Sequence, residues 1–164
     1  MKLSDIFQRL LGTSAATVLM WFYPALLLVA NVALCFTEHY SAASCAANVL
    51  LPGGIFLLIC ASSRNVGRTV LLCLPLSIYA AFQIVLLFLY GESLIAIDMF
   101  LNVVTTNPAE VNELLGNLGR AILTVVIIYV PPIVWAVWLL CTHRDVPRRA
   151  LRTARRAGGA LAAA

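Results

Sequence analysis

Charged residues are scarce in this chain. Only 11% of its 164 residues are Asp, Glu, Lys or Arg, whereas 62% are hydrophobic, and the mean hydropathy is +0.96. A soluble domain carries about 25% charged residues, because its surface has to be hydrated. The shortage excludes a water-soluble globular domain and predicts a protein embedded in a membrane.

The sequence also lacks the patterns of metal and nucleic-acid sites. His39 and His143 stand at no metal-ligand spacing, and the basic residues are not interleaved with aromatic ones. We therefore expect no metal, no cofactor on this chain and no nucleic-acid partner. The five cysteines contain no CxxC pair; they are Cys35, Cys45, Cys60, Cys73 and Cys141. Cys35 and Cys45 either form a disulfide or act as small packing residues, and the second use is the commoner one.

Four apolar segments are long enough to cross a bilayer. A helix needs about 20 apolar residues to span about 30 Å of hydrocarbon, and its backbone amides must be paired within the helix. The segments are residues 17–36, 46–62, 69–90 and 121–141. Prolines 24, 52, 75, 131 and 132 lie inside them, and we expect kinked rather than broken helices, because membrane helices tolerate proline. The predicted fold class is all-α, a polytopic transmembrane helix bundle.

The basic residues give this bundle an orientation. Lys2 and Arg9 precede the first span, Arg64 and Arg68 follow the second, and most of the other arginines follow the fourth. Because Lys and Arg concentrate in cytoplasmic loops, the N-terminus is predicted to be cytoplasmic. The net charge of +4 then also favours contact with anionic lipids.

This orientation divides the chain into three parts. Residues 1–13 form a short amphipathic cytoplasmic start, and residues 14–141 form the transmembrane domain with a periplasmic helical segment at 91–119. Residues 142–164 are a basic cytoplasmic segment followed by an apolar stretch, which is either the start of a fifth span or a flexible tail. We expect short interfacial helices in the periplasmic segment, between the third and fourth spans.

The periplasmic segment contains the most polar stretch of the chain, DMFLNVVTTNPAEVNELLGN at residues 98–117. Asn107, Pro108 and Glu110 form a capping-box pattern, which predicts a helix from Pro108 to residue 115 that ends at Gly116. Glu110 is then explained by capping alone.

A second explanation of Glu110 is a binding site. Asn102, Thr106 and Glu110 are spaced four residues apart, so a helix would place them on one face, and Pro108 would bend that face into a concave one. An amide, a hydroxyl and a carboxylate in this arrangement suit a cationic hydrogen-bonding group, such as the ammonium of a lipid headgroup.

Residues 98–115, DMFLNVVTTNPAEVNELL, resemble the periplasmic motif of the lipid A phosphoethanolamine transferases, the family that includes the mobile colistin-resistance enzymes. In that family the motif lies between the third and fourth of five transmembrane helices, as in this chain. The resemblance implies that Asn102, Thr106 and Glu110 hold the donor, phosphatidylethanolamine, and that the acceptor is lipid A. It also implies a multi-pass protein of the bacterial inner membrane.

The family's catalytic domain has no counterpart among these residues. In the family a periplasmic domain after the fifth span carries a threonine nucleophile and zinc ligands, so we assign no catalytic residue here and expect zinc in that missing domain. The resemblance therefore implies that this chain is the membrane-anchoring and donor-lipid-binding domain of a transferase that moves phosphoethanolamine from phosphatidylethanolamine to lipid A, truncated before the catalytic domain.

The alternative is a small polytopic inner-membrane protein, either a transporter subunit or a lipid-binding accessory, with no enzymatic role. A transporter places its polar residues near the middle of the bilayer. In this chain they gather outside it, which favours binding of a lipid headgroup.

Overall fold

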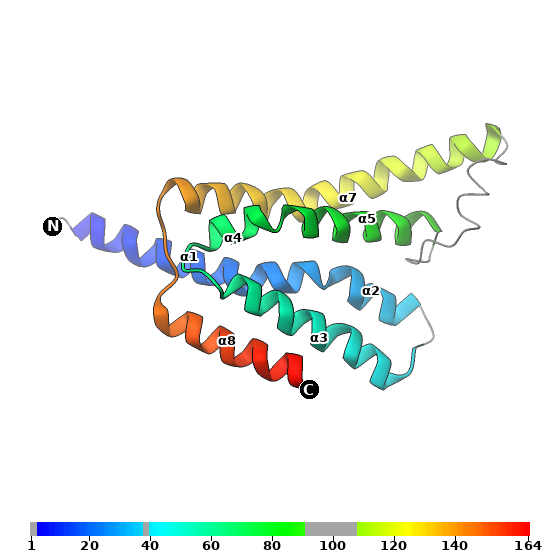
Figure 1. Cartoon of the computed structure of the whole chain (residues 1–164). Helices are drawn as coiled ribbons and strands as arrows, with labels where there is room; N and C mark the ends of the chain where they lie inside the picture. The colour runs from blue at the N-terminus through cyan, green and yellow to red at the C-terminus, as the bar shows by residue number, and fades with distance from the viewer. Residues whose placement is uncertain (1–2, 38–39, 91–107) are drawn as a thin grey trace.

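The computed structural model describes residues 3–37, 40–90 and 108–164, and the side chains of residues 15–37, 40–87 and 118–164 (Figure 1). The regular structure of this part of the chain is entirely helical, with no strand, which confirms the all-α prediction. The helices are α1 (Leu3–Leu27), α2 (Val29–Thr37), α3 (Ala42–Cys60), α4 (Val66–Leu72), α5 (Leu74–Tyr90), α7 (Pro108–Cys141) and α8 (Arg148–Ala163).

Three helical segments are long and apolar enough to cross a membrane. They are Ala15–Thr37, Ala42–Cys60 and Leu118–Cys141, and there are four spans if Val66–Leu72 and Leu74–Leu87, which are bent by 58°, count as one. Large apolar side chains point outward from these helices: Leu72 is 71% exposed, Ile78 67% and Ile127 63%. Such a surface would be unfavourable in water but suits lipid, so the protein is membrane-embedded.

Most of the prolines leave their helices continuous, as predicted. Pro52 lies inside α3, and Pro131 and Pro132 lie inside α7. After Pro24 the chain passes from α1 into α2 through Leu28, whose amide donates to the Pro24 carbonyl at 3.2 Å. These spans are therefore bent at most, because the hydrogen bonds lost at each proline are few.

The third predicted span differs, because α4 and α5 meet at Cys73 with a bend of 58°. Pro75 has no N–H to donate to the carbonyl of Leu71, and its ring disfavours the helical conformation of Leu74. The expectation of a kinked but continuous helix is therefore wrong for residues 69–90, where the chain makes a sharp break.

The helix α1 is at the centre of the bundle and contacts α2, α3, α4, α5 and α7. Its Leu19, Met20 and Tyr23 are almost completely buried. Around them α4 and α7 approach so closely that a Cβ added at Gly67 would lie 2.4 Å from the carbonyl oxygen of Ala136. A small residue is therefore required at position 67, as is common where membrane helices cross.

The helix α8 lies alongside α3 (Figure 1). Its buried face consists of Leu151, Ala154 and Gly158, at helical spacing. Gly54 of α3 faces this surface so closely that an added Cβ would lie 2.6 Å from the amide nitrogen of Ala162. Residues 148–163 are thus a packed helix. Whether they begin a fifth span stays a prediction, because α8 is not among the segments long and apolar enough to cross a membrane.

Two predicted helix boundaries also differ. Helix α1 runs without a break from Leu3 into the first span, and the amphipathic cytoplasmic character of residues 1–13 stays a prediction. The helix predicted to end at Gly116 begins at Pro108 as expected, but α7 runs on to Cys141. A glycine inside a helix costs only about 1 kcal/mol, which the rest of a long helix easily offsets.

Candidate lipid-binding site

The predicted headgroup site lies mostly outside the described residues. Asn102 and Thr106 fall within residues 91–107, and of Glu110 the structure describes the backbone, in the first turn of α7. The grouping of these three side chains therefore stays a prediction, as do the interfacial helices expected between the third and fourth spans. Because α7 is continuous, Glu110 lies about 12 Å along the helix from Leu118, where the apolar span begins.

Four helix ends lie on this side of the bundle (Figure 1). α2 ends and α3 begins there, and so do the end of α5 and the start of α7. The last described residue before the motif at residues 98–115 is Tyr90, at the end of α5, and residues 108–115 of the motif are the first residues of α7. We refer to this side as the motif end of the bundle.

Between the middle of the bundle and the motif end lies a hollow of about 250 Å³. It is lined by both apolar and polar side chains, from α1, α2, α3 and α5; among them are Leu27, Phe56, Leu76, Asn31, Tyr79 and Gln83. Asn31 lies six residues before the end of α2 and Gln83 seven before the end of α5, which places both amides roughly 10 Å from those helix ends. The hollow thus offers hydrogen-bonding groups inside an apolar layer.

Asn31 has partners within the protein. Its Nδ2 donates to the backbone oxygen and to Oδ1 of Asn48, both at 3.1 Å, and Asn48 Nδ2 donates to the Asn31 carbonyl at 3.2 Å. This pair joins α2 to α3, as side-chain amides commonly do between membrane helices.

The Gln83 amide, which lines the same hollow, has no hydrogen-bond partner among the described residues. The same holds for the Tyr79 hydroxyl, on the same helix one turn away. Gln83 is half-buried and Tyr79 is 61% exposed, so both polar groups can be reached from outside the protein. Gln83 and Tyr79 are therefore the groups in this hollow that are free to bond a ligand, such as the ester oxygens of a phospholipid.

Cys35 and Cys45 lie beside the asparagine pair, and both are free thiols. The Sγ of each lies near the backbone oxygen of the other, at 3.8 Å for Cys35 and 3.9 Å for Cys45. The sequence left open whether these two cysteines form a disulfide or are packing residues. In the structure they are packing residues between α2 and α3.

Comparison of this chain with family models, curated proteins and solved structures found no match. Within the described part of the chain, no group of three or more His, Cys, Asp or Glu residues could hold a metal ion. The functional assignment therefore depends on the motif at residues 98–115 and on the geometry around it.

Proposed function

We propose that this chain is the membrane-anchoring and donor-lipid-binding domain of a phosphoethanolamine transferase that modifies lipid A in the bacterial inner membrane. The observation that carries the proposal is the motif at residues 98–115 between the third and fourth predicted spans. In this proposal Asn102, Thr106 and Glu110 hold the headgroup of phosphatidylethanolamine, and the Glu110 carboxylate accepts hydrogen bonds from its ammonium. The threonine nucleophile and the zinc belong to a periplasmic domain outside these 164 residues.

The hollow beneath the motif end supports this role. Its apolar side chains suit the acyl chains of a phospholipid, and the free groups of Gln83 and Tyr79 suit its ester oxygens. A lipid seated there would place its headgroup toward the ends of α5 and α7. The orientation that follows has the motif end in the periplasm and the arginine-rich end in the cytoplasm.

Binding of the donor can be tested on this chain. It is reconstituted into phosphatidylcholine vesicles that contain a photoactivatable phosphatidylethanolamine, and covalent labelling is measured by mass spectrometry. Glu110→Ala removes a hydrogen-bonded charge pair worth about 1.5–3 kcal/mol, so we expect labelling affinity to fall at least about tenfold. Glu113→Ala is the matched control, because it removes the same charge one turn further along α7 and should leave labelling unchanged.

Equal labelling of the Glu110→Ala and Glu113→Ala variants would contradict the headgroup site. Labelling by a phosphatidylglycerol probe as strong as by the phosphatidylethanolamine probe would instead favour a lipid-binding accessory without selectivity for the donor.

The enzymatic role requires the catalytic domain. In bacteria that produce this chain joined to such a domain, Glu110→Ala should abolish most phosphoethanolamine addition to lipid A, measured by mass spectrometry of extracted lipid A, while membrane insertion is unchanged. Lipid A modification at the level of the unaltered protein would refute the assignment of Glu110.

A further inference from the structure

A second hollow lies at the opposite end of the bundle, where α8 passes the connection between α3 and α4. It measures about 240 Å³ and is lined by Leu151 and four arginines: Arg64, Arg148, Arg152 and Arg155. We call it the arginine hollow. At the level of the sequence, these arginines were used only to predict the orientation of the chain in the membrane. Arg148, Arg152 and Arg155 are also spaced four and three residues apart, which places them on one face of α8.

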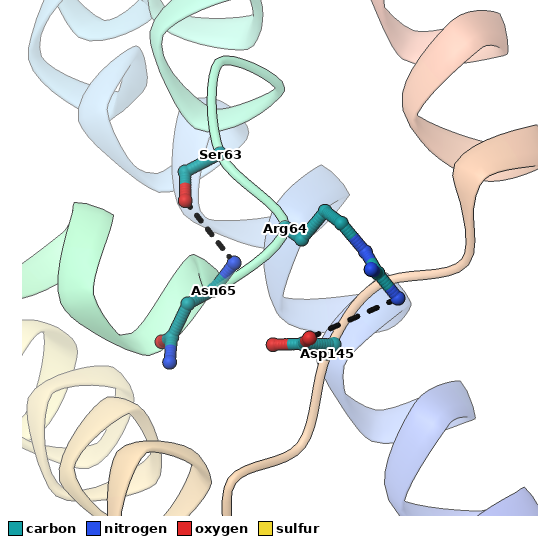
Figure 2. Close-up of polar contacts among 4 residues, drawn as sticks. All are labelled: Ser63, Arg64, Asn65 and Asp145. Atoms are coloured by element: carbon teal, nitrogen blue, oxygen red, sulfur yellow. Dashed lines mark hydrogen bonds and ion pairs between the residues drawn. The ribbon is translucent and has the colours of Figure 1, made fainter.

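Two of the four arginines have partners in the protein. Arg155 donates from Nε to the carbonyl of Ala61 at 2.8 Å and from Nη2 to that of Ser62 at 3.1 Å, at the C-terminal end of α3 where a cation is favoured. Arg64 lies 3.8 Å from Asp145, as Figure 2 shows, and both side chains are about half exposed. An exposed pair at this distance compensates little charge.

Arg148 and Arg152 have no partner at all among the described residues. The sequence of α8 contains no acidic residue, so nothing on the helix itself offsets them. They are one helical turn apart, and like charges at that spacing repel. Four guanidinium groups thus line the hollow, and among the described side chains Asp145, paired with Arg64, is the carboxylate next to them.

The direction of α8 adds to this positive field. Arg148 is its first residue, and Pro147 provides no side-chain cap for the free N–H groups of the first turn. The positive end of the helix dipole is thus at the arginine hollow, where basic residues are unfavourable unless an anion accompanies them. The volume corresponds to about eight water molecules, which is room for a phosphate group with part of a headgroup.

We propose that the arginine hollow binds the phosphate of an anionic phospholipid in the leaflet opposite the motif. Guanidinium groups bind phosphate oxygens through paired N–H donors, and basic pockets between membrane helices suit anionic headgroups. Leu58 and Ile59, near the end of α3, are each 37% exposed and provide an apolar surface for the acyl chains of the same lipid. The site lies away from the donor site and does not depend on the proposed transferase function.

The test uses the full chain in a nonionic detergent, titrated with dioctanoyl phosphatidylglycerol and followed by native mass spectrometry after buffer exchange, or by calorimetry. Salt is kept at about 0.3 M, so that the Debye length is below about 8 Å and diffuse attraction is screened. Two control ligands are titrated in the same way. Dioctanoyl phosphatidylcholine is a lipid without net charge, and inorganic phosphate is an anion without acyl chains.

The decisive comparison is between two double variants of equal charge. Arg148→Gln with Arg152→Gln removes the two unpartnered groups of the hollow, and we expect phosphatidylglycerol affinity to fall roughly thirtyfold, about fivefold for each arginine. Arg149→Gln with Arg156→Gln changes two exposed arginines of the same helix that do not line the hollow, and affinity should fall less than about threefold. Circular dichroism verifies that both variants keep their helix content.

Equal losses of phosphatidylglycerol affinity in the two double variants would overturn the proposal, because they would show that the lipid is attracted by the total charge of α8 and not by the arginine hollow. Equal affinity for phosphatidylcholine and phosphatidylglycerol would overturn it as well. Binding of inorganic phosphate as tightly as phosphatidylglycerol, and lost in the same variant, would replace the lipid by a soluble phosphate compound.

Discussion

The two halves of the bundle are held together by different means. In the half that contains α4 and α8, helix backbones touch directly at Gly67 and Gly54, with no side chain between them. In the half that contains α2, the side-chain amides of Asn31 and Asn48 join the helices. Close packing tolerates no added atom, whereas one hydrogen bond in a membrane is worth only about 0.6 kcal/mol. We therefore expect the first half to be sensitive to added volume and the second to be tolerant.

The largest effect is expected at Gly67. In Gly67→Leu the new Cβ would lie 2.4 Å from the Ala136 carbonyl oxygen, and backbone atoms cannot turn aside as a side chain can. We expect a loss of about 3 kcal/mol or failure to fold, measured by thermal unfolding in detergent. Gly119→Leu is the control, since nothing lies within 4 Å of its added Cβ. Similar melting temperatures for the two variants would show that α4 and α7 are not in contact.

The next effect concerns the docking of α8. Gly158→Leu places a side chain against the Gly54 carbonyl oxygen, 3.0 Å from the new Cβ, and should detach α8 at a cost of about 1–3 kcal/mol. Gly159→Leu alters the neighbouring position, where nothing lies within 4 Å, and should leave α8 in place.

Tryptic cleavage at the arginines of α8 is the measurement for this pair, and we expect it to be about tenfold faster in Gly158→Leu than in Gly159→Leu. Equal cleavage rates would contradict the close contact of α3 with α8.

A smaller effect on stability is expected from the loss of a buried tyrosine hydroxyl, and it should differ between Tyr23 and Tyr129. The Tyr23 hydroxyl lies 2.6 Å from Ser77 Oγ and 3.3 Å from the Cys73 carbonyl oxygen, whereas the Tyr129 hydroxyl has no partner in the described part of the chain. Tyr23→Phe should therefore lower the free energy of unfolding by about 1 kcal/mol, and Tyr129→Phe should not lower it. Denaturant titration in mixed micelles measures both. A loss in Tyr129→Phe as large as in Tyr23→Phe would contradict this difference.

The smallest effect is expected in the tolerant half. Asn48→Ala removes the two hydrogen bonds that the Asn48 side chain makes with Asn31 and should cost at most about 1 kcal/mol, since hydrogen bonds between membrane helices average about 0.6 kcal/mol each. The same denaturant titration applies. A loss larger than that of Gly158→Leu would reverse the comparison between the two halves.

Hydropathy predicted the spans well, because a helix in lipid must pair its own backbone and therefore has a minimum apolar length. The segment predicted at residues 121–141 corresponds to Leu118–Cys141, and the one at 17–36 to Ala15–Thr37. The break at Cys73 was not predicted, although Pro75 was noted, because the other prolines in these spans leave their helices continuous and the sequence does not distinguish Pro75 from them. The docking of α8 was not predicted because it depends on how helices distant in sequence pack.

The candidate sites were predictable to different extents. The motif at residues 98–115 was singled out because its polar residues stand out in an apolar sequence, and its role in binding the donor stays a prediction. The arginine hollow was missed, because the positive-inside rule counts arginines per loop and ignores their spacing along a helix. The spacing of positions 148, 152 and 155 was the available signal.

The break between α4 and α5 has a consequence for the surrounding lipid. A seven-residue helix such as α4 is about 10 Å long, and a turn of 58° away from α5 reduces its reach along the α5 axis to roughly half of that length. The hydrophobic thickness on this side of the protein is therefore smaller than along α7. We expect the bilayer to be compressed next to α4, and lipids with shorter acyl chains to be enriched there.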